Sequence, residues 1–376
     1  ALRGEAAHGH SRRCSPVMYR HTMKITSRTW LRNTYNEMRP QPMTCRVIAV
    51  TAPEHAELLS VDVPDTLGSS EIRGPTVATL VSPGTELGHY YLQSSAMHRS
   101  YPCYPGYAAV FRAEDLGRNV RDMQRGDLLF CTGNHQSTQK HAASEVLPVP
   151  PDLAPENALV TRLLEVTITA LSTTTARPGE PVVVSGAGPV GYLGAHLFAS
   201  AGYNVHVIEP DASRRAYLKR TGIETVYAAP PHDNERIAGK AALLLECSGR
   251  EQAVLDGLQL IRKKGEVVLI GMPWQRHSDA SARDLICAVF SRCAVMRSGW
   301  ERQLPWHAAH AGDPSIFDGY RLGLRWLAQG RIPLDDLVVK HDPVHPQDSY
   351  QSLRHNTADG LFHVFDWTTL TAGNAA

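Results

Sequence analysis

The chain has 376 residues, a length that corresponds to about two domains of ordinary size. Hydrophobic residues make up 43% and charged residues 20%, a globular mixture that excludes a wholly disordered chain. The formal net charge is +1, so we expect no chain-wide surface for nucleic acid. No stretch approaches ~20 consecutive apolar residues, so we expect no transmembrane helix and no membrane partner.

Seven cysteines are widely spaced and form no C-x-x-C pair. This argues against a disulfide framework or a zinc ribbon and favours a cytoplasmic setting. Residues 1–42 hold seven Arg and one Lys against Glu5 and Glu37. They lack the apolar core of a secretory signal, and their composition also resembles that of an organelle transit peptide. We expect a disordered leader or an added segment here, with the folded chain starting near Met43.

Residues 43–150 consist of short apolar runs separated by Gly, Pro, Asp and Asn. Short strands at this spacing predict a small all-β barrel or sandwich. The clearest runs are CRVIAV at 45–50, TVATLV at 76–81, YAAVFRA at 107–113, DLLF at 127–130 and HAASEVLPVP at 141–150.

The pattern changes after Pro178 and Gly179, where strands and helices alternate. Alternation of this kind predicts a parallel, doubly wound sheet, and a fully apolar VVV is typical of a strand covered on both faces. The predicted strands are 181–185, 204–209, 241–249, 265–272 and 293–300, and the predicted helices include 193–202 and 213–222. Cys247 and Cys287 lie in apolar runs, and we expect both to be core thiols. Beyond Glu301 we expect a helix at 318–330, a strand at 334–343 and a terminal strand at 361–367.

The segment GAGPVG at 186–191 is a G-x-G-x-x-G sequence between an apolar strand and a helix. Gly186 permits the tight turn, Gly188 lets the backbone approach a pyrophosphate, and Gly191 allows close packing of helix on strand. Pro189 and Val190 begin the helix, whose N-terminal N–H groups would face the phosphates. The segment therefore predicts a dinucleotide site.

Glu209 ends the second strand, 18 residues beyond Gly191, where a carboxylate accepts hydrogen bonds from the adenosine ribose. A carboxylate there repels a 2′-phosphate, so we expect NAD rather than NADP. Arg214 and Arg215 follow, and their guanidinium groups would instead suit a phosphate. We interpret them mainly as a solvated helix face, with Arg214 contributing to the cofactor site.

The order of a β-rich half, a dinucleotide-binding middle and a short return resembles the medium-chain dehydrogenase/reductase superfamily, the zinc alcohol dehydrogenase group. The segments that carry this resemblance are PGTEL at 83–87, YPGY at 104–107, RGD at 125–127, GAGPVG at 186–191 and KKGEVVLIGMP at 263–273. The resemblance implies an α/β chain in which a GroES-like β-barrel is joined to a Rossmann doubly wound parallel sheet.

That resemblance also implies the domain limits. They are a GroES-like catalytic domain at 43–150, a Rossmann domain at 151–300, a return to the catalytic domain at 301–367 and a tail at 368–376. It further implies that Gly271 and Met272 contact the cofactor, because the strand at 263–273 is similar to the one over the nicotinamide. We also expect Ser248 to contact the cofactor.

The sequence departs from the zinc-binding members of this family at the metal ligands. Pro83 stands where they have a cysteine, Tyr107 where they have a histidine, and Ala108 where they have a glutamate. Glu165 matches a third ligand of the polyol-dehydrogenase branch, but catalytic zinc needs three protein ligands. The cysteine-rich lobe is also missing, since Cys131 is the only cysteine between 107 and 160. We therefore expect no zinc. The turn at 83–86 and the ending FDW are most similar to zinc-free relatives of threonine, sugar and bacteriochlorophyllide dehydrogenases.

Without a metal, side chains must polarise the substrate oxygen and carry its proton. Thr85 matches the family's hydroxyl relay, and Tyr107 is either a proton donor or a plug that fills the ligand position. Glu165 is either a base or the charge partner of a basic residue. Trp274, Trp300 and Trp306 either line a substrate cleft or serve packing.

These observations predict a zinc-independent NAD(P)-dependent oxidoreductase that acts on a secondary alcohol or ketone with a sugar-like, cyclic or secondary-metabolite skeleton. One alternative is a quinone or enoyl reductase that uses NADPH, and another is a dinucleotide-binding protein without turnover. We also expect a homodimer, because CAVMRSGW at 293–300 is an apolar strand late in the sheet.

Overall fold

The computed structural model describes residues 42–92 and 100–372. The predicted leader at 1–42 lies outside the described residues except for its last position, as does the end of the predicted tail. No described helix is both long and apolar enough to cross a membrane.

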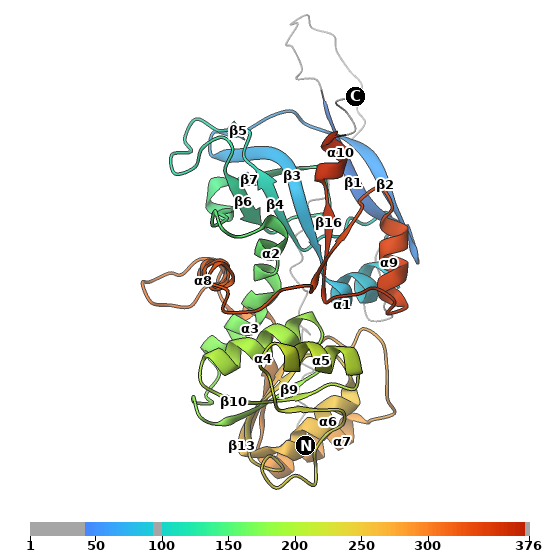
Figure 1. Cartoon of the computed structure of the whole chain (residues 1–376), viewed down its shortest axis with the longest axis vertical. Coiled ribbons are helices and arrows are strands. Elements are labelled where there is room, and N and C mark those ends of the chain that lie inside the picture. Colours follow the sequence, from blue (N-terminus) through green and yellow to red (C-terminus); the bar gives the residue numbers. More distant parts are fainter. Residues whose placement is uncertain (1–41, 93–99, 373–376) are drawn as a thin grey trace, which may run out of the picture. The chain divides into compact units, whose positions relative to one another are not determined.

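A six-stranded sheet, drawn in the lower half of Figure 1, is parallel throughout and has the order β11-β10-β9-β12-β13-β14. Numbered along the chain this is 3-2-1-4-5-6, the doubly wound order of dinucleotide-binding folds, which confirms the predicted Rossmann sheet. The direction of winding reverses between β9 and β12, and ligands bind at such a point. The strands are β9 (Pro181–Ser185), β10 (Asn204–Ile208), β11 (Val226–Tyr227), β12 (Ala241–Glu246), β13 (Ile261–Leu269) and β14 (Val295–Ser298).

Helices cover both faces of this sheet, as its apolar strands require. Val182 and Val184 of β9 belong to one hydrophobic cluster, and Val183 between them belongs to another. The first cluster includes side chains of α3 (Thr161–Thr173) and α4 (Pro189–Ser200), and the second includes α6 (Glu251–Leu260) and α7 (Ala282–Arg292). α5 (Ala212–Arg220) begins at Asp211, whose carboxylate accepts hydrogen bonds from two backbone N–H groups.

The second large sheet has eight strands and forms the GroES-like part of the fold. Its main path is β15-β16-β3-β4-β6-β8, and β5 and β7 pair with the long strand β3. The strands are β3 (Glu71–Val81), β4 (Ala108–Arg112), β5 (Asp115–Leu116), β6 (Leu128–Cys131), β7 (Thr138–Ala142), β8 (Leu147–Pro148), β15 (Val338–His341) and β16 (Phe362–Asp366). A separate hairpin joins β1 (Met43–Ala52) to β2 (His55–Val63).

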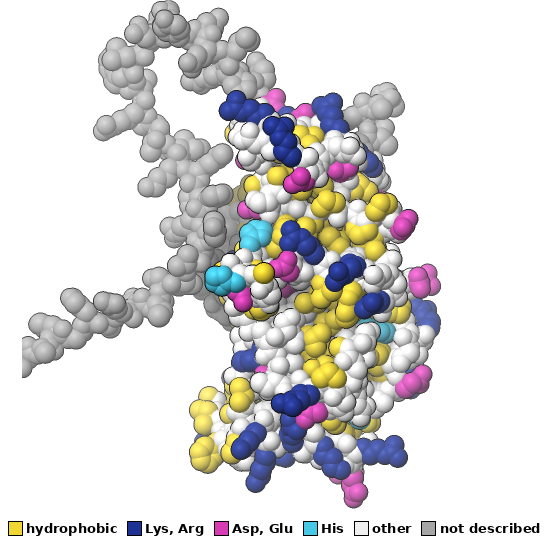
Figure 2. Space-filling view, turned by 90° about the vertical axis from the view of Figure 1, so that its left-hand side faces the viewer, with side chains coloured by type: hydrophobic (Ala, Val, Ile, Leu, Met, Phe, Trp, Pro, Cys, Tyr) yellow, Lys and Arg dark blue, Asp and Glu magenta, His cyan; other side chains and the backbone are white. Residues whose placement is uncertain are grey.

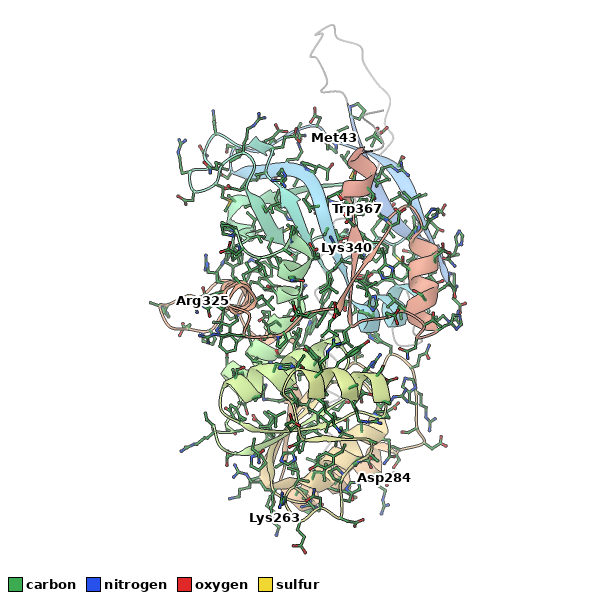
Figure 3. All side chains as sticks on the ribbon, viewed as in Figure 1. Met43, Lys263, Asp284, Arg325, Lys340 and Trp367 are labelled. Carbon is green, nitrogen blue, oxygen red and sulfur yellow. The ribbon has the colours of Figure 1, made fainter. Side chains whose placement is uncertain are left out.

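The end of the chain returns to this second sheet. β16 pairs antiparallel with β3, from His363 opposite Val81 to Asp366 opposite Ala78. Figure 3 accordingly shows Lys340 and Trp367 near the second sheet, whereas Lys263 and Asp284 lie near the Rossmann sheet. The remaining helices are α1 (Pro83–Thr85), η1 (Glu86–Tyr91), η2 (Ala143–Glu145), α2 (Pro155–Leu159), η3 (Glu301–Gln303), α8 (Ile316–Ala328), α9 (Pro346–Arg354) and α10 (Thr368–Ala372).

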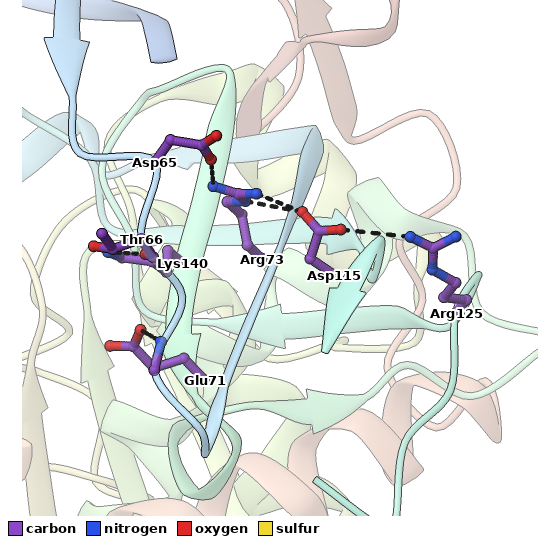
Figure 4. A network of polar contacts seen from close by, with 8 residues as sticks. Asp65, Thr66, Glu71, Arg73, Asp115, Arg125 and Lys140 are labelled. Carbon is purple, nitrogen blue, oxygen red and sulfur yellow. Dashed lines mark hydrogen bonds and ion pairs between the residues drawn. The ribbon is translucent and has the colours of Figure 1, made fainter. Parts of the chain in front are cut away.

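Charged side chains of both signs are mixed over the surface. Dark blue and magenta groups are interspersed on the face in Figure 2. On the second sheet, Arg73 pairs with Asp65 and Asp115, and Asp115 also pairs with Arg125 (Figure 4). Pairing of this kind leaves no large field of one sign there.

The expectation that Cys287 is a core thiol is wrong, because its side chain is exposed on α7. Cys247 is partly buried. Only part of the apolar run around Cys287 faces the sheet, because Ile286 and Phe290 on the same helix are 67% and 84% exposed.

Candidate active site

The glycine-rich segment lies between β9 and α4, at the end of the sheet where the winding reverses. Gly186 has a φ of +87°, in the left-handed region that favours glycine. A Cβ added to Gly191 would lie 1.8 Å from the Gly186 carbonyl oxygen, so helix and turn touch directly. Pro189 and Val190 form the first positions of α4, and their helix end offers N–H groups to an anion.

The surroundings of Gly188 are open. A Cβ added there would have a single neighbour within 4 Å among the described residues, Arg214 Nη1 at 3.9 Å. Arg214 also donates from Nη2 to Asn356 Oδ1 at 3.3 Å. Arg215 instead donates to the carbonyl oxygens of Glu209 and Pro210 at 2.9 and 2.6 Å. Arg214 is therefore the arginine that faces the turn.

Glu209 is buried against the same turn. Its Oε2 accepts a hydrogen bond from the Ala187 N–H at 2.6 Å, and its Oε1 accepts one from the Asp211 N–H at 2.8 Å. These bonds hold a carboxylate beside the glycine-rich segment, on the side where an adenosine ribose would lie.

Ser248, Gly271 and Met272 follow the next two strands, β12 and β13. A Cβ added to Gly186 would lie 3.0 Å from Ser248 Cα, and one added to Gly271 would lie 2.2 Å from the Gly249 nitrogen. The three loops therefore pack together at one edge of the sheet. The open turn, the helix N-terminus and the nearby carboxylate fit a bound dinucleotide.

A second part of the site is the short helix α1 with η1, which contains Thr85. Glu86 is buried and accepts three hydrogen bonds: from the Ser82 N–H at 2.8 Å, from Tyr350 Oη at 2.6 Å, and from His135 Nε2 at 3.0 Å. His135 Nδ1 lies 2.7 Å from Thr79 Oγ1, which also accepts from Trp367 Nε1 at 2.9 Å. This network ties the turn that bears Thr85 to β3 and to the end of the chain.

Trp274 connects this turn to the cofactor side. A Cβ added to Gly88 would lie 2.3 Å from the Trp274 ring. The indole that follows Gly271 and Met272 therefore packs directly on η1, three residues beyond Thr85. This contact joins the loop after β13 to the segment that follows Thr85.

Tyr107 lies beneath a buried guanidinium group. Arg162 Cζ is 4.0 Å from the centre of the Tyr107 ring, a cation–π contact. Arg162 Nη2 also donates to Glu301 Oε1 at 2.6 Å, and both side chains of this ion pair are buried. Burial raises the pKa of Tyr107 to about 12, although the charge of Arg162 opposes this shift. The phenol therefore keeps its proton at neutral pH.

Glu165 is fully buried, one turn beyond Arg162 on α3. Its Oε1 accepts from Thr169 Oγ1 at 2.6 Å, whereas its Oε2 has no hydrogen-bond partner. A Cβ added to Gly319 of α8 would lie 2.9 Å from Glu165 Cγ, so α8 closes over it. Burial raises the pKa of Glu165 to about 7, and Arg162 partly offsets the shift. A carboxyl group with this pKa exchanges its proton near neutrality.

The structure thus brings Tyr107 and Glu165 together around Arg162. Thr85 directly precedes Glu86 in the chain, and the charge of Glu86 contributes to the raised pKa of Tyr107. Trp306 packs beside Tyr320 of α8, with ring centres 5.9 Å apart, whereas Trp300 is 61% exposed. Sequence reasoning missed Arg162, Glu301 and the Glu86 network. The available signal was a charged residue one helical turn before Glu165, in a helix with no other charged residue.

The residues at the zinc-ligand positions do not fit a catalytic zinc ion. Pro83 and Ala108 have no donor atom in their side chains, and the phenol of Tyr107 retains its proton. The guanidinium group of Arg162 beside Tyr107 would repel a second cation. Among the described side chains, no group of three or more His, Cys, Asp or Glu is placed to hold a metal.

Comparison with known proteins gives one family model and many relatives. The model described as zinc-binding dehydrogenase matches residues 189–307. The L-threonine 3-dehydrogenase of Thermococcus kodakarensis is 29% identical over 270 residues, which cover 60% of this chain and 75% of that protein.

Two solved structures share the fold. Galactitol-1-phosphate dehydrogenase from Escherichia coli has a TM-score of 0.71 at 14% identity, covering 85% of this chain and 99% of that one. Acetophenone reductase from Geotrichum candidum, in complex with NAD, has a TM-score of 0.70 at 12% identity, covering 86% and 97%. Together with the sheet order and the glycine-rich turn, these findings show that the chain has the fold of the medium-chain dehydrogenase/reductase superfamily and is similar in sequence to its dehydrogenases.

Proposed function

We propose that this protein is a zinc-independent NAD(P)-dependent oxidoreductase that transfers hydride between the nicotinamide and a secondary alcohol or ketone. The observation that carries this proposal is the position of Arg162, a buried cation against Tyr107 and one helical turn from Glu165. A fixed positive charge stabilises negative charge on the substrate oxygen, which is the task that a metal performs in other enzymes.

The cofactor, when bound, supplies or accepts the hydride, and the chain's own residues do the rest. Gly186, Gly188 and the start of α4 would hold the pyrophosphate. Thr85 and Tyr107 offer hydroxyl groups on the substrate side, and Glu165 exchanges a proton near neutral pH. The packing of Trp274 on η1 supports a short path between the two halves of the site.

We propose NAD as the preferred cofactor, because Glu209 places a carboxylate beside the glycine-rich turn. A second candidate, an NADPH-dependent quinone or enoyl reductase, is favoured by Arg214, whose Nη1 approaches Gly188. Dissociation constants for the two cofactors separate these candidates. NAD should bind more tightly than NADP, and the reverse order would favour the reductase.

Two variants test the origin of this preference. Glu209→Gln keeps the size of the side chain and one of its two acceptor oxygens but removes the charge, so it should shift the preference towards NADP by ~1–3 kcal/mol. Arg215→Gln is the matched control, because its guanidinium group bonds backbone carbonyls rather than facing the turn. Turnover of cyclohexanol or cyclohexanone should accompany binding, whereas binding without any turnover would support a non-catalytic dinucleotide-binding protein.

We further propose a homodimer formed through β14, the last strand of the Rossmann sheet. Val295 of β14 is 55% exposed, and Ile286 and Phe290 of the preceding helix α7 are exposed as well. An apolar sheet edge of this kind favours pairing with a second copy. We also propose that the protein is cytoplasmic, as its cysteine pattern favours.

A further inference from the structure

Several buried polar atoms without a hydrogen-bond partner gather in one place. They belong to Arg162, Glu165, Trp306 and Tyr320, which we call the polar cluster. The atoms are Arg162 Nε and Nη1, Glu165 Oε2, Trp306 Nε1 and Tyr320 Oη, five of the eleven such side-chain atoms among the described residues. Buried polar atoms are nearly always bonded, so five together indicate a site whose polar ligand completes them.

The residues of the polar cluster are linked by a chain of close approaches between α3, α8 and Trp306. Arg162 Cζ is 6.0 Å from the centre of the Tyr320 ring, and the Tyr320 and Trp306 ring centres are 5.9 Å apart. Gly319, next to Tyr320, approaches Glu165 closely. Arg162 and Glu165 are buried, whereas Trp306 is only partly buried. The polar cluster therefore has a deep polar end and a partly exposed rim.

The charges of the polar cluster nearly cancel. Arg162 carries one positive charge, which Glu301 offsets through their 2.6 Å ion pair. Glu165 adds a negative charge only when it is ionised, and its pKa of about 7 keeps it partly protonated at neutral pH. An anionic ligand would face the carboxyl groups of Glu165 and Glu301, and the one cation, Arg162, is already paired. An uncharged hydroxyl or carbonyl group would accept hydrogen bonds from the N–H groups of Arg162 without this repulsion.

Building on the proposed function, we propose that the polar cluster is the subsite for the substrate oxygen, that Arg162 donates to this oxygen through Nε or Nη1, and that the subsite selects uncharged alcohols and ketones over anionic ones. Arg162 is then a catalytic residue that touches the reacting group.

The reaction balances with the cofactor as the source or acceptor of hydride, Glu165 as the source or acceptor of the proton, and Arg162 as the group that stabilises the charge on oxygen. In ketone reduction, bound NAD(P)H would supply the hydride and become NAD(P)+: its C–H bond would break as a new C–H bond forms at the carbonyl carbon, and the π electrons of the C=O bond would move to the oxygen. Arg162 stabilises the negative charge that develops there. The oxygen takes the proton of the Glu165 carboxyl group, which regains one from solvent, and alcohol oxidation reverses each step.

A pair of inert probes of the same shape tests the selectivity. Cyclohexanecarboxamide is an uncharged carbonyl compound, and cyclohexanecarboxylate is its anionic counterpart. With the full-length protein saturated with NADH, isothermal titration calorimetry should show the carboxamide binding at least tenfold more tightly. Failure of the carboxamide to bind, or tighter binding of the carboxylate, would overturn the proposal.

Variants at Arg162 test the contact itself. Arg162→Ala should weaken carboxamide binding at least tenfold and lower kcat/KM for cyclohexanone at least 100-fold, while the dissociation constant of NADH changes less than twofold. Added guanidinium at millimolar concentration should restore at least part of the turnover, because it refills the space of the deleted group. Unchanged carboxamide binding would contradict the proposal.

Arg297→Ala is the matched control. Arg297 Nε donates to Glu266 Oε1 at 3.1 Å, and two of its buried nitrogens also lack partners. Glu266 accepts a hydrogen bond from Thr174, which follows the last residue of α3. Arg162 is near the first residue of this helix, about 18 Å from Thr174 along the helix axis. This control should not change carboxamide binding or respond to guanidinium, and a response equal to that of Arg162→Ala would overturn the assignment.

Two further outcomes remain decisive. If Arg162→Ala does not fold, Arg162→Lys keeps the charge but loses donor atoms, and it must bind the carboxamide at least tenfold more weakly for the proposal to stand. Probe binding that depends on Arg162 without any turnover would defeat the proposed function but not this subsite. If the protein turns over the substrate but Arg162→Ala leaves probe binding unchanged, the proposed function would stand and the subsite proposal would fail.

Discussion

Burial makes Glu165 the described carboxyl group best suited to exchange a proton at neutral pH. Its surroundings comprise Arg162 and Thr169 on its own helix, Glu301 of η3, Tyr107 before β4 and Tyr320 of α8. Arg162 and Thr169 favour the ionised form, but the loss of solvent outweighs them and raises the pKa to about 7. The folded protein therefore holds this proton more tightly than the unfolded chain does.

Glu165 should consequently make stability depend on pH. Its contribution is fully present below the unfolded pKa of roughly 4.5 and is lost as the pH rises through about 7. Urea unfolding of the parent should show a free energy that falls over this range by about 2–3 kcal/mol more than that of Glu165→Gln. The exposed Glu114→Gln serves as control and should follow the parent, and a Glu165→Gln profile identical to the parent would contradict the account.

The proposed function assigns the hydroxyl groups of Tyr107 and Thr85 as donors to the substrate. Removing such a donor typically costs ~3–4 kcal/mol in the barrier, or about 100- to 1000-fold in turnover. Tyr107→Phe keeps the ring beneath Arg162, and Thr85→Val keeps the shape of the side chain. Each variant should lower kcat at least tenfold in steady-state assays while cofactor affinity stays within about twofold. If both turn over like the parent, neither hydroxyl carries the chemistry.

At the scale of elements, β14 and α7 carry the exposed apolar side chains Val295, Ile286 and Phe290. Phe290 and Ile286 are 84% and 67% exposed. Large apolar side chains exposed together favour an interface with another molecule. Light scattering at micromolar concentration should therefore give the mass of a dimer for the parent and of a monomer for the Ile286→Glu/Phe290→Glu variant. Val344→Glu, at an exposed apolar residue before α9, should remain dimeric. A monomeric parent would refute the proposed interface.

The elements that sequence predicts best are those fixed by local signals. The strand, glycine turn and helix around 181–200 follow from apolar periodicity and from glycines that a tight turn requires. Cys287 shows the limit of such signals, because an apolar run does not reveal whether it faces a core or an uncovered edge.

The candidate site could be predicted only in part for a related reason. Thr85, Tyr107 and Glu165 stand at positions that family motifs mark. Arg162 contacts Glu301, 139 residues further along the chain, and the ring of Tyr107. Contacts of this range depend on how η3 and α3 pack, and no local pattern encodes them.

For the whole molecule, we propose a dinucleotide-binding sheet combined with a substrate site. In this site the guanidinium group of Arg162 stabilises the charge on the substrate oxygen, as a metal does in other enzymes. The most direct measurement is the zinc content of purified protein, determined by mass spectrometry on the sample used to assay cyclohexanol oxidation with NAD. We predict far less than one zinc per chain and turnover that survives dialysis against a chelator. One tightly held zinc per chain, whose removal abolishes turnover and whose return restores it, would contradict the account.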